Sequence, residues 1–212
     1  NILLGRITID DVVDIIREQG EHQALSAAGV DEDEDLFGPV PRAVRRRVIW
    51  LTINMVTAFL ASAVVGRFSD ALEQIVALAI LMPIVAGMGG NAGTQVLTLM
   101  IRGLALGQVG ASNLRALVWK EVRVAALNGL IMGSIVGLVS FAWFHDWKLA
   151  LVIGAALLSN FLTGALTGVL APAILKRLNL DPAISAGVVL TTCTDVIGFL
   201  SFLGLGTLVL MK

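Results

Sequence analysis

Residues 75–101, IVALAILMPIVAGMGGNAGTQVLTLMI, contain no Asp, Glu, Lys or Arg. A helix needs about 20 apolar residues to cross the hydrocarbon core of a membrane, so this stretch is long enough to span it. Four similar apolar runs occur in the chain, at 48–66, 124–144, 149–175 and 183–211. Because backbone groups in lipid must be hydrogen-bonded internally, the expected form is helical. The sequence therefore predicts an all-α polytopic membrane protein with five transmembrane helices.

The composition of the whole chain agrees with this class. The 212 residues are 57% hydrophobic and 15% charged, whereas soluble domains carry about 25% charged residues. A net charge of −1 gives no support for a nucleic-acid partner. The single Cys193 excludes a disulfide framework and a multi-cysteine metal site, and only His22 and His145 are available for a histidine site. No catalytic motif such as HExxH or a phosphate loop is present, so we expect no enzyme.

The basic residues predict the orientation. Most Lys and Arg residues precede the first span, or lie between the second and third or the fourth and fifth spans. The positive-inside rule then places the N-terminus in the cytoplasm and the C-terminus outside.

The N-terminal part has a different character. Residues 2–9, ILLGRITI, form a β-like run, and residues 9–19, IDDVVDIIREQ, have helical spacing with an acidic first turn. We interpret residues 1–23 as the C-terminal end of a soluble domain. Residues 24–47 are expected to form a juxtamembrane connecting helix or linker, with a break near Gly38, Pro39 and Pro41. Residues 48–212 then form the transmembrane domain.

Asp195 is the only formally charged residue within the five apolar runs. A charge at the centre of a membrane helix costs about 2.5–3.5 kcal/mol on insertion scales. We favour an ionised carboxylate in a hydrated cavity that binds a cation, with Thr191, Thr192 and Thr194 as nearby oxygen ligands. The alternative is a protonated Asp195 that is hydrogen-bonded within the helix bundle.

The segment PIVAGMGGNAGTQ, residues 83–95, is polar and rich in glycine. Its composition favours a broken or unwound helix, although simple tilt or a packing kink are alternatives. Carbonyl, amide and hydroxyl oxygens suit Mg²⁺ or Ca²⁺, so Gly90, Asn91 and Thr94 are candidate ligands. Weaker pore-lining candidates are Gly87, Gly89, Gln95, Asn160 and Gly187. A lone amide such as Asn160 also fits a role in helix–helix contact, as does the four-residue glycine spacing in the third and fourth runs.

One carboxylate per chain is too little charge for a divalent ion at this depth. A two-fold homodimer would bring two Asp195 side chains together, and their total charge of about −2 would balance Mg²⁺. Since Mg²⁺ gives up its waters reluctantly, such a site would hold the hydrated ion.

Two stretches carry a resemblance to a known family. Residues 83–109, PIVAGMGGNAGTQVLTLMIRGLALGQV, and residues 180–199, LDPAISAGVVLTTCTDVIGF, resemble the MgtE family of magnesium channels and transporters. The resemblance implies a homodimer with a central Mg²⁺-selective pore, in which Asp195 matches the pore aspartate and residues 89–95 match the pore segment. It places the protein in the plasma membrane of a bacterium or archaeon.

The resemblance also extends to the cytoplasmic part. Residues 1–23 look like the end of a CBS domain, and residues 24–47 like the family's plug-like connecting helix. It further implies N-terminal regulatory domains, absent from this chain, that bind Mg²⁺ and close the pore. The acidic run that includes Asp31 and Asp35 is a candidate Mg²⁺ contact at the cytoplasmic mouth, with a solvated linker as its alternative.

Two other functions are compatible with the sequence. A proton- or sodium-coupled divalent-cation transporter would use Asp195 as a relay, but five spans do not divide into the two equal halves typical of that class. A membrane anchor for a cytoplasmic sensor would have no use for a costly carboxylate at membrane depth.

Overall fold

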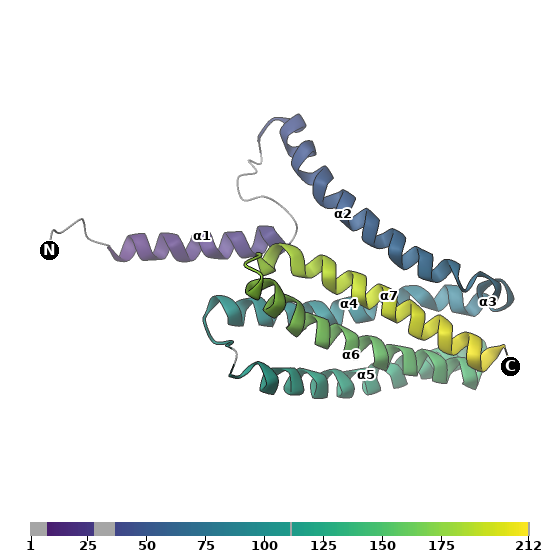
Figure 1. The fold of residues 1–212 in the computed structure, drawn as a ribbon. Coiled ribbons are helices and arrows are strands. Elements are labelled where there is room, and N and C mark those ends of the chain that lie inside the picture. The colour runs from purple at the N-terminus through teal and green to yellow at the C-terminus, as the bar shows by residue number, and fades with distance from the viewer. Residues whose placement is uncertain (1–7, 28–36, 111, 212) are drawn as a thin grey trace. The chain divides into compact units, whose positions relative to one another are not determined.

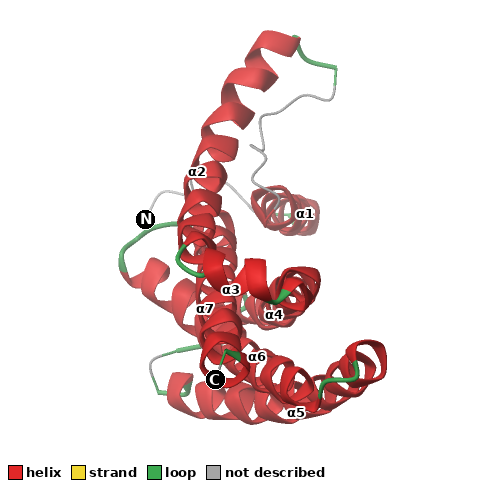
Figure 2. Ribbon diagram, turned by 90° about the vertical axis from the view of Figure 1, so that its right-hand side faces the viewer, coloured by secondary structure: helices red, strands yellow, loops and turns green. Residues whose placement is uncertain are grey.

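The computed structural model describes residues 8–27, 37–110 and 112–211, and every regular element in them is a helix (Figures 1 and 2). The helices are α1 (Ile9–Ala27), α2 (Val40–Gly66), α3 (Ser69–Gln74), α4 (Val76–Ala105), α5 (Leu114–Phe144), α6 (Trp147–Arg177) and α7 (Pro182–Leu210). Five of these, namely α2, α4, α5, α6 and α7, are long and apolar enough to cross a membrane. The predicted all-α fold with five spans is confirmed.

The chain divides into two compact units, residues 1–53 and 54–212, and α2 crosses the boundary between them. In the first unit, the backbone amide and the hydroxyl of Thr8 both donate to Asp11 Oδ2, each at 2.7 Å, at the start of α1. These hydrogen bonds lower the pKa of Asp11. Helix α1 continues to Ala27, through the domain boundary expected after residue 23. Most of the predicted β-like run and the acidic residues 31–35, Asp31 and Asp35 included, lie outside the described residues.

Two helices begin earlier than the apolar runs predicted. Helix α2 starts at Val40, directly after the bend at Gly38, and Pro41 lies in its first turn, where its missing N–H breaks no hydrogen bond. Helix α5 starts at Leu114 rather than at 124. Charged residues form helices as well as apolar ones do, so the apolar runs mark only the central part of these helices.

The expected interruptions of the long spans do not occur. Helix α4 runs without a break through Pro83 and the glycine-rich segment, and α6 runs through Pro172. The expectation of broken helices was therefore wrong. Glycine weakens an isolated helix, but here its lack of a side chain allows neighbouring helices to approach, and that packing supports the helix.

Helix α6 is the centre of the second unit and packs against α4, α5 and α7 (Figures 1 and 2). Its buried side chains include Ile153, Leu157 and Phe161. These belong to one core with buried residues of α4 and α7, such as Leu78, Val85, Phe202 and Leu203. This arrangement fixes which faces of α4 and α7 are left uncovered.

Helices α5 and α6 form an antiparallel pair whose backbones approach closely. A Cβ atom on Gly133 would lie 2.9 Å from the carbonyl oxygen of Gly154, and one on Gly137 would lie 3.0 Å from that of Ala150. The tight connection is made by His145, whose φ is 56°, and by Asp146, which accepts from the amides that begin α6. The glycine spacing thus reflects helix packing, as the packing interpretation predicted.

The substitution Gly133→Ala should destabilise the protein, because the new Cβ meets backbone rather than a flexible side chain. Overpacking of this kind costs about 1–3 kcal/mol. We expect a lower Tm in detergent for Gly133→Ala, whereas Gly204→Ala, which meets nothing within 4 Å, should leave the Tm unchanged or raise it. Equal Tm values for both variants would contradict the close packing of α5 on α6.

Candidate cation site

The glycine-rich segment of α4 has two distinct faces. Gly89 and Gly93 are buried against α6, and a Cβ on Gly164 of α6 would lie 3.0 Å from the carbonyl oxygen of Gly89. Residues two positions away in a helix point about 200° apart. Accordingly, Asn91 lies on the opposite, exposed face. That face also carries the exposed residues Pro83, Gly87, Thr94, Gln95 and Thr98.

Helix α7 presents a second polar face. Gly187, Thr191 and Asp195 follow one another at four-residue spacing, so they share one side of the helix. Thr191 is exposed, and Gly187, Thr192 and Asp195 are half-buried, whereas Thr194 is fully buried. Asp195 has no hydrogen-bond or ion-pair partner among the residues that the structure describes.

The packing contacts place Asp195 and Asn91 at the same level of the bundle. Gly89 of α4 and Gly198 of α7 both contact the side chain of Asn160, and Gly93 of α4 contacts Leu190 of α7. Asp195 lies between positions 190 and 198 of α7, so its level falls between those of Gly89 and Gly93. The two polar faces therefore belong to neighbouring helices and coincide in depth.

The threonine hydroxyl protons on these faces are used within the helices. Thr94 Oγ1 donates to the carbonyl oxygen of Gly90 at 2.8 Å, and Thr192 Oγ1 donates to that of Val188 at 2.6 Å. Thr191 Oγ1 similarly donates to the carbonyl oxygen of Gly187 at 3.1 Å. A hydroxyl that donates internally keeps its oxygen lone pairs as acceptors. The exposed faces are thus rich in hard oxygen acceptors, which suit Mg²⁺ or Ca²⁺.

Asn160 lies away from the two exposed polar faces, beside the buried candidate Gly89. Its side chain is fully buried where α6 meets α4 and α7, and its Nδ2 donates to the carbonyl oxygen of Val85 at 2.8 Å. Its Oδ1 has no hydrogen-bond partner among the residues that the structure describes. Since a side chain at Gly89 or Gly198 would collide with it, Asn160 occupies a space that these two glycines leave free. Its position agrees with the helix–helix contact role, and a part in lining a pore stays a prediction.

Glu121, a buried carboxylate that is 6% exposed, was not among the predicted site residues. It lies outside the apolar run at 124–144, so the search of the five runs for charged residues did not include it. Its sequence spacing could have indicated its burial, because Glu121 lies four residues before Ala125 in a series of buried positions that continues with Gly129 and Gly133. Groups of three or more His, Cys, Asp or Glu residues that could bind a metal do not occur in the described part of the chain.

Comparison with known proteins identifies the family. The MgtE family model, described as a divalent cation transporter, matches residues 82–205. The magnesium transporter MgtE of Bacillus subtilis is 34% identical over 209 residues, covering 98% of this chain and 46% of that protein. The MgtE proteins of Enterococcus faecalis and Thermus thermophilus are 29% and 32% identical, covering 97% and 98% of this chain and 45% and 46% of their own lengths. The chain thus spans about half the length of these curated relatives, and over that length it belongs to the MgtE family of divalent cation transporters.

Proposed function

We propose that this chain conducts Mg²⁺ across the plasma membrane through a pore formed with a second copy of itself, with Asp195 as the central cation-binding carboxylate. Its relatives of similar sequence are named magnesium transporters. The observation that carries the proposal is the carboxylate of Asp195, which has no partner among the described residues and lies level with Asn91, on polar faces of the neighbouring helices α7 and α4. Regulation by further cytoplasmic domains, and a contribution from Asp31 and Asp35, stay predictions.

The cost of a charge in lipid supports this assignment. An ionised carboxylate at the centre of a membrane helix costs about 2.5–3.5 kcal/mol, and no described side chain offsets that cost for Asp195. Asn91, Thr94 and Thr98 add polar groups to the exposed surface at neighbouring positions. Such a surface is more stable against water or another polar surface than against lipid, so we place it at a hydrated interface.

A second copy of the chain would supply the second negative charge that a divalent cation needs. A single Asp195 balances only half of the charge of a divalent ion. Two-fold symmetry is the commonest arrangement of homo-oligomers, and it pairs a surface with the same surface of the partner. When α4 and α7 of two copies face each other, the two carboxylates together supply a charge of about −2 beside amide and hydroxyl oxygens.

Hydrated Mg²⁺ fits this ligand set better than a dehydrated ion. The ion demands near-octahedral geometry and usually keeps several of its waters. The amide of Asn91 and the lone pairs of Thr94 and Thr191 would accept hydrogen bonds from those waters, since the hydroxyl protons are already bound to helix carbonyls. The carboxylate supplies the charge, and the neutral oxygens orient the hydration shell.

The substitution Asp195→Asn should reduce Mg²⁺ flux into proteoliposomes by about tenfold or more, because it keeps the shape of the side chain and removes its charge. A matched control is Asp70→Asn, since Asp70 is an exposed carboxylate outside the membrane-spanning helices. We expect normal flux in the control. Normal flux in Asp195→Asn would refute the assignment, and wild-type flux that requires a proton or sodium gradient would favour a coupled transporter instead.

Cysteine cross-linking tests the two-copy arrangement once Cys193 is replaced by Ser. A cysteine in place of Asn91 should link two chains in membranes, because the exposed face of α4 lies at the proposed axis. A cysteine in place of Leu138, which is 69% exposed on α5, should not link, because that surface is expected to face lipid. Efficient linking through position 138 but not 91, or a monomer that conducts Mg²⁺, would overturn the shared pore.

A further inference from the structure

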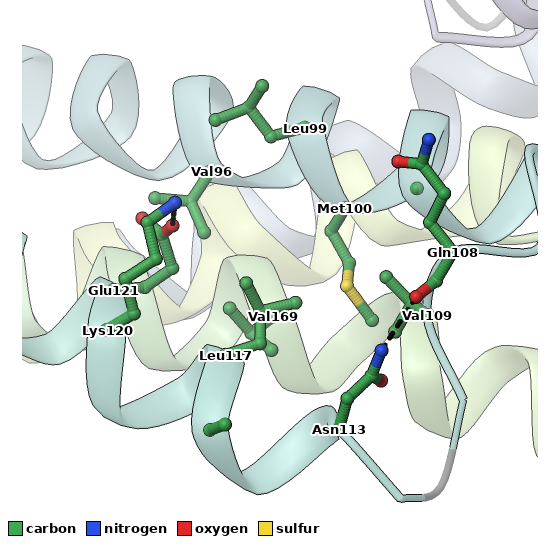
Figure 3. A pocket seen from close by; sticks show the side chains of 12 residues that line it. Val96, Leu99, Met100, Gln108, Val109, Asn113, Leu117, Lys120, Glu121 and Val169 are labelled. Atoms are coloured by element: carbon green, nitrogen blue, oxygen red, sulfur yellow. Dashed lines mark hydrogen bonds and ion pairs between the residues drawn. The ribbon is translucent and has the colours of Figure 1, made fainter.

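A cavity of about 460 Å³ lies between α4 and α5 (Figure 3). Its α4 residues lie on a side of the helix different from the polar face. Val169 of α6 contributes to its wall, and the connection between α4 and α5 closes one end with Gln108 and Asn113. Apolar side chains from both helices line most of it, including Val96, Leu99, Met100 and Leu117. Lys120 and Glu121 add one charge of each sign to this otherwise apolar lining.

The carboxylate of Glu121 is left short of hydrogen-bond donors. Its side chain is 7% exposed, and its one partner among the described residues is Lys120, whose Nζ lies 3.1 Å from Oε1. An ionised carboxylate offers about four acceptor positions, so most of them have no donor from the protein. The side chain of Lys120 is 66% exposed, which leaves most of its ammonium group open to a further partner.

The position of the pair along α5 corresponds to a membrane interface. Trp119 is exposed next to it, and Arg115 and Arg123 lie within two turns. Further along the same helix, Leu127 and Leu130 are 62% and 55% exposed, as expected for a surface in contact with lipid tails. Tryptophan and cationic side chains at this boundary are typical of the headgroup region. The cavity therefore meets the bilayer where headgroups and acyl chains join.

We propose that this cavity binds a phospholipid with a primary ammonium headgroup, of the phosphatidylethanolamine type. The lipid ammonium carries three N–H donors and fills the free acceptor positions of Glu121, while the lipid phosphate accepts from Lys120. One acyl chain lies along Val96, Leu99 and Leu117, which are the apolar lining residues with accessible side chains. A zwitterionic headgroup matches a pair of opposite charges, and the apolar lining matches the chain.

Two other headgroup classes fit this lining less well. An anionic phosphatidylglycerol brings a second negative charge to the buried carboxylate and no ammonium donor. Phosphatidylcholine has a quaternary nitrogen with no N–H, so it leaves the acceptor positions of Glu121 empty. The proposal is independent of cation conduction, because the cavity and the polar face use different sides of α4.

Lipid titration followed by native mass spectrometry tests the proposal on the purified, delipidated protein. The probes are phosphatidylethanolamine, phosphatidylcholine and phosphatidylglycerol with identical acyl chains. Charge-assisted hydrogen bonds typically change affinity by about tenfold or more. We therefore expect phosphatidylethanolamine to bind the wild-type protein with a Kd about tenfold or more below those of the other two lipids.

The variants separate the headgroup contacts from the chain contacts. Glu121→Gln should raise the Kd for phosphatidylethanolamine to the value for phosphatidylcholine. Lys120→Gln should raise the Kd for phosphatidylethanolamine and the Kd for phosphatidylcholine by the same factor. Ala116→Trp, which fills the cavity from an exposed position, should weaken the binding of all three lipids. Asp70→Asn should leave the binding of each lipid unchanged. Equal binding of phosphatidylethanolamine and phosphatidylcholine, tighter binding of phosphatidylglycerol, or unchanged binding in Glu121→Gln would each overturn the proposal. The headgroup comparison on wild-type protein decides the question even if Glu121→Gln fails to fold.

Discussion

The close approach of α4 to α6 is the contact on which the rest of the arrangement depends. A Cβ on Gly164 would lie 3.0 Å from the carbonyl oxygen of Gly89 and 3.1 Å from the amide nitrogen of Gly93, so the two backbones touch with no side chain between them. This contact fixes the rotation of α4 about its axis. Because Asn91 lies between the two buried glycines in sequence, it is turned to the opposite, exposed face. Packing thus decides which polar groups remain available to an ion.

Asn160 extends the same constraint to α7. Its side chain occupies the space that Gly89 and Gly198 leave free, which fixes the relative height of α4 and α7. Asp195, three residues before Gly198, is thereby held at the depth of Asn91. The hydroxyls of Ser159 and Ser201, 3.1 Å apart, form another contact between α6 and α7. The proposed cation ligands themselves make none of these contacts, so a change at the ligands should alter conduction more than folding.

The sequence predicted the class of fold and the existence of all five spans because long uncharged runs have few alternatives in a membrane. It did not predict where α2 and α5 begin, since hydropathy detects the lipid-exposed centre of a helix and not its charged ends. It also suggested interruption at Pro83, although the helix is continuous there, and Gly89 and Gly93, which follow, form packing contacts with neighbouring helices. The burial of Asn160 and Glu121 depends on how neighbouring helices pack, and the spacing of residues along the sequence predicts that packing only in part. Asp195 was identified from its charge and from the family resemblance, and its role as a cation ligand stays a prediction.

The central claim is that two copies of Asp195 hold one divalent cation between them. The most direct measurement is the structure of the protein in a lipid environment with Mn²⁺ in place of Mg²⁺, because anomalous scattering locates that ion without ambiguity. We expect a single Mn²⁺ peak on a two-fold axis, flanked by Asp195 and Asn91 of both copies. Asp195 in contact with lipid tails, or Mn²⁺ bound within one chain far from α7, would contradict it.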